Sequence, residues 1–173
     1  MRSRAIAATL ILSGLSACNQ KANPSAPATT EAVPANQVAP ARDDRTPLEE
    51  PHGAIDPKSV EAAGQVVQSY GARIEQKQWA EANALWGDAV QAAKFEGELS
   101  ANPEVHLEIG NPGEPEGAAG SIYVTMPVFF YGDTKDGQPF RRSADVIVRR
   151  VNDVPGSTEA QRLWHIERID WTS

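Results

Sequence analysis

Residues 121–131 read Ser-Ile-Tyr-Val-Thr-Met-Pro-Val-Phe-Phe-Tyr, and this stretch decides the fold class. Val124, Met126, Val128 and Phe130 occupy every second position, which predicts a long strand with one apolar face. Pro127 has no amide proton to donate to a neighbouring strand. We therefore expect a bulge or an unpaired side at that position.

The apolar residues in the segments on either side of this strand recur with two different periods. Downstream, residues 140–151 and 162–171 read as strands, and upstream residues 105–109 alternate in the same way. Before residue 100 the apolar spacing is helical, and it predicts helices over 57–77, 78–87 and 88–97, the first capped by Asp56 and the third by Asp88. Helices followed by strands predict an α+β fold with the helices packed on one face of an antiparallel sheet.

The order of these elements resembles a known superfamily. The order is a long helix, a second helix carrying Trp79 and the pair Leu85-Trp86, and a third helical piece. Strands follow and end near Trp164-His165-Ile166. This order is similar to that of nuclear transport factor two-like domains. That superfamily, which is cystatin-like in fold, includes polyketide cyclase-like and steroid isomerase-like members. The resemblance covers about residues 58–171 and implies a curved, cone-like sheet. Residues 149–166 also resemble a segment of uncharacterised bacterial envelope proteins.

The N-terminal part of the chain has the pattern of a lipoprotein. Residues 1–17 combine two arginines, a short apolar run and small residues, which predicts a signal peptide. Cys18 follows Leu-Ser-Ala, a sequence that resembles the bacterial lipobox, so we expect Cys18 to be lipidated. Residues 18–53 are rich in Pro and Ala and poor in large apolar residues, which predicts a disordered tether before a domain at 54–173.

The predicted lipid anchor gives an expected location. By resemblance to bacterial sorting rules, Asn19 favours the outer membrane, with the domain facing the periplasm. The inner membrane and the cell surface remain alternatives. A multi-acyl anchor is sufficient for stable membrane attachment.

Composition excludes several function classes. The 173 residues carry a formal net charge of −7, which argues against nucleic acid as a partner. Cys18 is the only cysteine, and no two of the three histidines stand at ligand spacing, so we expect no metal site. The sequence contains no nucleophile elbow, P-loop or dinucleotide-binding glycine pattern, and we expect no cofactor.

Three residues are candidates for acid–base chemistry. The resemblance to isomerase-like enzymes implies an inward carboxylate and a tyrosine, and Tyr70 and Asp145 are the nearest counterparts. Tyr70 also fits the apolar stripe of the first helix. Asp145 shares a strand face with Arg141 and Arg149, which favours a position away from the helices, paired with an arginine. His165 lies inside the cone if Leu163, Ile169 and Trp171 mark the core face, and outside it if Trp164 and Ile166 do.

Five residues are candidates for a binding surface. Tyr123, Phe129 and Tyr131 share one strand face if Val124 and Met126 point inward, and grouped aromatic residues suggest a protein contact, including a homodimer. Arg141 and Arg149 on the next strand fit an anionic ligand site or cross-strand ion pairs, and we favour ion pairs.

Two functions from different classes fit the sequence. The first is a membrane-anchored, non-catalytic binding or assembly module that uses the aromatic and arginine-bearing sheet face to contact an envelope protein or a second copy. The second is a small-ligand pocket, or an isomerase-like or cyclase-like enzyme, that uses Tyr70, Asp145 or His165. We expect the first, because the sequence alone defines no acid–base pair.

Overall fold

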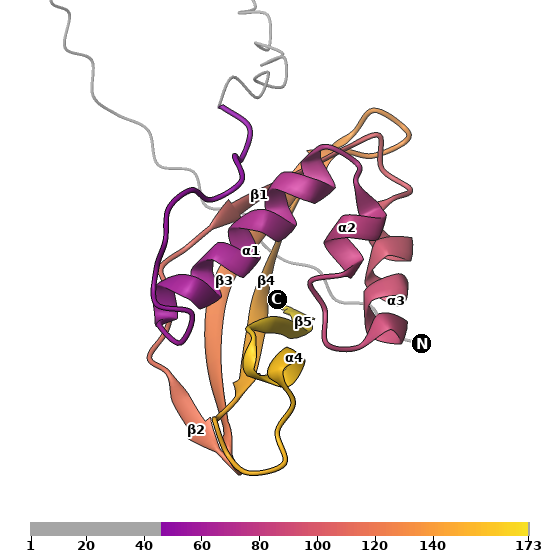
Figure 1. Cartoon of the computed structure of the whole chain (residues 1–173). Helices are drawn as coiled ribbons and strands as arrows, with labels where there is room; N and C mark the ends of the chain where they lie inside the picture. Colours follow the sequence, from indigo (N-terminus) through magenta and orange to yellow (C-terminus); the bar gives the residue numbers. More distant parts are fainter. Residues whose placement is uncertain (1–45, 173) are drawn as a thin grey trace, which may run out of the picture. The chain divides into compact units, whose positions relative to one another are not determined.

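The computed structural model describes residues 46–172. In chain order the elements are α1 (Val60–Glu75), α2 (Trp79–Asn83), α3 (Ala89–Leu99), β1 (Glu104–Ile109), β2 (Glu116–Ala118), β3 (Ser121–Asp133), β4 (Pro139–Val151), α4 (Glu159–Arg162) and β5 (His165–Trp171). The three N-terminal helices pack on a curved, antiparallel, five-stranded sheet (Figure 1). The α+β class expected from the sequence is confirmed.

The sheet has the order β1-β3-β4-β5, and the short strand β2 pairs with the start of β3. Strands β3 and β4 pair without interruption over their full lengths, and Pro127 lies opposite Asp145. Of the two alternatives expected at Pro127, the bulge is absent and the unpaired side is present: its carbonyl accepts from Gly110, and its missing N–H faces the loop beyond the end of β1. The irregularity lies instead between β4 and β5, beside Ile147 and Val148.

Helix α1 starts later than the sequence suggested. Its N-cap is Ser59, whose hydroxyl accepts from the N–H of Ala62. The prediction that Asp56 is the cap is wrong: its carboxylate accepts from the N–H of Lys58 and stabilises the turn before the helix. The predicted apolar stripe is correct, and Ala63, Val67, Tyr70 and Ile74 are all buried.

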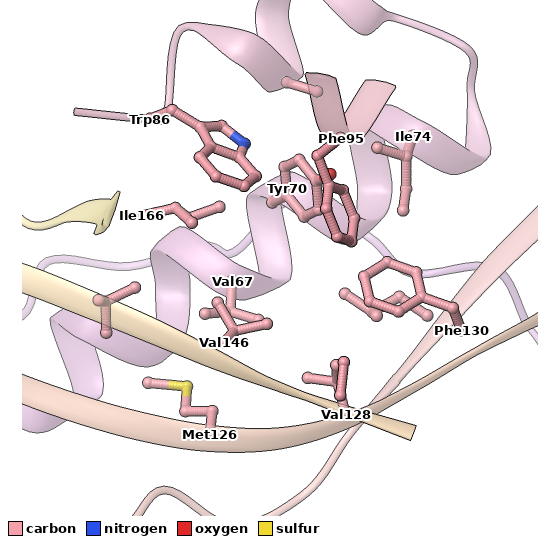
Figure 2. Packing of buried hydrophobic residues seen from close by; sticks show 14 of the residues in the cluster. Val67, Tyr70, Ile74, Trp86, Phe95, Met126, Val128, Phe130, Val146 and Ile166 are labelled. Carbon is pink, nitrogen blue, oxygen red and sulfur yellow. The ribbon is translucent and has the colours of Figure 1, made fainter. Parts of the chain in front are cut away.

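Helices α2 and α3 close one end of the core. Asp88 caps α3 as predicted, accepting from two backbone N–H groups, but the helix continues past Gly97 to Leu99. Between these helices and the sheet lies a cluster of aromatic rings (Figure 2). Phe95 links the two layers: its ring centroid lies 5.7 Å from that of Trp86, 5.6 Å from that of Phe130 and 5.2 Å from that of Trp171.

A short strap, residues 46–50, runs along α1 (Figure 1). Leu48 packs against the core, and its N–H donates to Oε2 of Glu75 at 2.9 Å. Gln68 donates to the carbonyl of Glu49 at 2.9 Å, and Arg73 pairs with Glu50 at 3.3 Å. The C-terminal end of the expected tether therefore contacts the domain. The signal peptide, Cys18 and the rest of the tether lie outside the described residues.

A buried arginine holds the segment between β4 and β5. Arg150 is only 3% exposed, donates to the carbonyl of Arg162 at 3.0 Å and pairs with Asp153 at 3.4 Å. Asp153 also bonds Lys58, next to α1, and lies 3.8 Å from Arg162. The hydrogen bond from Lys58, followed by the nearby positive charges, lowers the pKa of Asp153. Thr158 and Gln161 form a capping box at the start of α4.

No helix formed by residues 46–172 is long and apolar enough to cross a membrane.

Candidate binding surface

The five predicted binding residues lie on the sheet face that points away from the helices, which we call the outer sheet face. Along β3 the inward residues Val124, Met126, Val128 and Phe130 are buried, so the side chains between them point outward. The strand register places Tyr123 opposite Arg149 and Tyr131 opposite Arg141. The outer sheet face comprises Tyr123, Phe129, Tyr131, Arg141 and Arg149.

Arg141 organises one end of the outer sheet face. Its guanidinium lies 4.1 Å from the ring centroid of Phe129 and 5.6 Å from that of Tyr131, within the range of cation–π contacts. The same guanidinium donates to Glu108 on β1 at 2.9 Å. Phe129 is still 38% exposed. The ring of Phe129 thus contacts the guanidinium of Arg141 and still remains partly exposed at the surface.

Arg149 organises the other end. Its guanidinium donates twice to the hydroxyl of Ser121, at 3.2 and 3.1 Å, and once to Glu167 at 3.5 Å. It also lies 5.6 Å from the ring centroid of Tyr123. Ser121 is buried beneath these contacts. Sequence reasoning did not single out Ser121 or Glu108, and only the strand register could have placed them beside the two arginines.

Both arginines have carboxylate partners on other strands: Glu167 on the neighbouring β5 for Arg149, and Glu108 on β1, across β3, for Arg141. This arrangement matches the expectation of cross-strand ion pairs, although Arg141 pairs with Glu108 and not with Asp145. Exposed pairs of this kind contribute about 0.2–1 kcal/mol each, so they orient side chains more than they stabilise the fold. A surface that combines an exposed aromatic ring with paired charges is suited to contact with another protein, because such interfaces are enriched in aromatic residues and arginine.

Tyr70 lies on the opposite side of the sheet, inside the core (Figure 2). It is 2% exposed, and its ring meets Trp86 edge-on with centroids 6.2 Å apart. Burial raises the pKa of Tyr70 far above its ordinary value, so the hydroxyl stays protonated. Its surroundings are those of a packed core residue.

Asp145 and His165 both lie on the outward side. Asp145 stands opposite Asp170 on β5 and Pro127 on β3, and no arginine pairs with it among the ion pairs found in residues 46–172. The sequence left two placements open for His165. Trp164 and Ile166 are buried, so the imidazole points out of the core, 3.7 Å from Glu167.

The three candidate acid–base residues are therefore not brought together. Tyr70 is enclosed by apolar side chains, and the sheet separates it from Asp145 and His165. General acid–base catalysis needs both groups within reach of one substrate. In the described part of the chain, no three His, Cys, Asp or Glu side chains are arranged to hold a metal ion.

Comparison with known proteins gives no assignment of function. No protein-family model matches the sequence, and neither does any curated protein. One similar solved structure is described as a nuclear transport factor 2 (NTF2-like) superfamily protein from Salmonella enterica subsp. enterica serovar Typhimurium str. LT2. It is 12% identical with a TM-score of 0.49, and the match covers 66% of this chain and 93% of that chain.

A second similar structure is described as Aln2 from a Streptomyces species. It is 9% identical with a TM-score of 0.44, and the match covers 69% of this chain and 93% of that one. The first description names the superfamily that the element order resembles. At these scores neither neighbour supplies a site or an activity for this chain.

Proposed function

We propose that this protein is a membrane-anchored envelope lipoprotein whose nuclear transport factor two-like domain is a non-catalytic binding or assembly module. The observation that carries the proposal is Phe129, an exposed aromatic ring held on the outer sheet face by Arg141. The packed interior supports it, because Tyr70 is enclosed there by apolar side chains. The lipobox-like sequence before Cys18 supplies the anchor.

The partner of the outer sheet face is an envelope protein or a second copy of this chain. Aromatic and arginine side chains carry much of the binding energy at protein interfaces. Pairs such as Arg141–Glu108 give the face both signs of charge, which does not select an anionic partner. The tether predicted between Cys18 and the domain would let the domain search for a partner at a distance from the membrane. A linker of that length has an average reach of roughly 30 Å when it is flexible.

The anchor is tested by the mass of the N-terminal peptide of the mature protein from bacterial membranes. A lipid-modified Cys18 is expected, together with release of the Cys18→Ser variant from the membrane fraction. An unmodified Cys18 in membrane-bound protein would contradict the anchor.

The binding surface is tested by photo-crosslinking in living cells, with the crosslinking residue at position 129. The matched control places the same residue at Val90 on α3, which is an apolar side chain 79% exposed on a different surface. A specific crosslinked product is expected from position 129 and not from position 90. Its mass separates a second copy from another envelope protein. Equal products from both positions, or none from 129, would overturn the proposed surface.

A further inference from the structure

A separate pocket lies where β5 begins, and we call it the β5 pocket. It has a volume of about 730 Å³. Its lining consists of residues 84–88, Gln91 on α3, the outward side chains of Arg149, His165 and Glu167, Val151, and residues 160, 161, 163 and 164. Ligand pockets in proteins have volumes of roughly 300–1,000 Å³. Of the three acid–base candidates only His165 contributes to it, and its imidazole points out of the core. It is therefore not the pocket inside the cone expected from the sequence.

Two polar groups on the floor of the β5 pocket have unused bonding capacity. The carboxylate of Glu167 has its closest contacts at 3.5 Å, to Nη1 of Arg149, and at 3.7 Å, to Nε2 of His165. The Nδ1 of His165 lies 3.2 Å from the carbonyl of Leu163, which assigns the proton of a neutral ring to Nδ1. In that ring Nε2 is an acceptor. It faces a second acceptor, the carboxylate of Glu167, and the 3.7 Å between them is too long for a hydrogen bond.

The charges of the β5 pocket favour a cation over an anion. Glu167 and Asp88 supply two carboxylates, and Asp88 already caps α3. Arg149 supplies one guanidinium that is already bonded to Ser121 and Glu167. A donor placed between Glu167 and His165 would bond both acceptors at once. An anion placed there would face the carboxylate of Glu167, whereas the unpaired indole N–H groups of Trp86 and Trp164 are buried.

The imidazole is held in place by close packing on the backbone. A Cβ atom added at Gly87 would lie 2.4 Å from Cδ2 of His165, so only glycine lets the ring sit there. The N–H of Gly87 donates to the carbonyl of Ile166, and the N–H of Ile166 donates to Leu85. These two bonds tie the pocket wall to β5. The site is therefore formed before any ligand arrives.

We propose that the β5 pocket binds a primary ammonium group carried on a small apolar body. The ammonium bridges Glu167 and Nε2 of His165, and the apolar part lies against Leu85 and Leu163. Leu163 is 57% exposed and offers apolar surface at the rim. This inference goes beyond the proposed function and does not require the membrane anchor. Arg149 is the residue that the β5 pocket shares with the outer sheet face.

The test titrates the full mature chain with hexylamine and, separately, with hexanoate, which has a similar alkyl chain but the opposite charge. Binding is followed through backbone amide NMR shifts. Saturable shifts at residues 85–88 and 165–167 are expected for hexylamine, with hexanoate at least about tenfold weaker. A hydrogen bond to a charged group accounts for a change of this size.

Variants assign the effect to the two acceptors. Glu167→Gln should weaken hexylamine binding about tenfold. His165→Phe keeps the ring but removes Nε2, and it should also weaken binding. The matched control is Asp170→Asn, because Asp170 is another β5 carboxylate paired with an arginine, Arg168, at 2.8 Å; it should bind normally. Equal binding of hexanoate, unchanged binding by Glu167→Gln, or no saturable shift with either probe would overturn the proposal.

Discussion

Two glycines on α1 provide a sharp test of how the strap is held. Gly64 and Gly71 lie in the same helix, but an added Cβ atom would meet nothing within 4 Å at Gly64. At Gly71 it would lie 2.5 Å from Cδ1 of Leu48 and 2.9 Å from Cδ2 of Leu107. The two Gly→Ala substitutions therefore share the same gain in helix propensity and differ only in what the new methyl group meets.

The expected magnitudes follow from these contacts. Alanine is favoured over glycine inside a helix by about 1 kcal/mol, and Gly64→Ala should raise the free energy of unfolding by about that amount. At Gly71 the same gain is set against overpacking, which costs about 1–3 kcal/mol in a filled core. Leu107 is fully buried and cannot move away, whereas Leu48 in the strap is only partly buried and can. Gly71→Ala should therefore be less stable than Gly64→Ala by about 1–3 kcal/mol.

Urea unfolding of the two variants and the parent chain measures this difference. The midpoints are comparable if the dependence on urea concentration is unchanged. If Gly71→Ala is as stable as Gly64→Ala, then Leu48 and Leu107 do not fill the space beside α1 and the strap contact is wrong. In the Leu48→Ala background the penalty at Gly71 should shrink, because one of the two clashing side chains is gone.

Three further predictions test other parts of the structure. Phe130→Ala should lower the free energy of unfolding by about 3–5 kcal/mol in urea unfolding, since the ring is fully buried; a loss below about 1 kcal/mol would contradict this packing. Asp153 has a lowered pKa, so its bond to Lys58 stabilises the fold above its ordinary pKa of 3.8 and is lost as pH falls through the lower folded value. Asp153→Asn should accordingly flatten the stability–pH curve of acid unfolding below about pH 4, and an unchanged curve would contradict it. Gly87→Ala should displace His165 and shift its ring NMR signals, and unshifted signals would show that the ring does not sit on Gly87.

The sequence predicted the elements well where one face is buried. The stripe of α1 and the alternation in β3 and β4 are set by burial against a single core, so the period of apolar residues reveals them directly. Strand β2 escaped prediction because all three of its residues are exposed, and no alternation marks it. The start of α1 was misplaced because Asp56 and Ser59 are both good caps, and only the path of the preceding turn decides between them.

The candidate surface was also partly visible in the sequence. Alternation alone placed Tyr123, Phe129 and Tyr131 on one face, because successive side chains of a strand point to opposite sides. The partners of Arg141 and Arg149 depend on which strands are neighbours and in what register. Glu108 precedes Arg141 by 33 positions in the sequence, yet the two side chains lie 2.9 Å apart.

By itself the sequence determined the periods of the apolar residues, and through them the α+β class and the inward residues of each element. Local chemistry is sufficient for these because each rests on neighbours a few positions apart. The tertiary structure decided the face of His165, the separation of Tyr70 from the outward candidates, and the pocket in which His165 meets Glu167. Those outcomes depend on the β4–β5 register and on the packing of residues 84–88 against β5, which bring together residues that lie far apart along the chain.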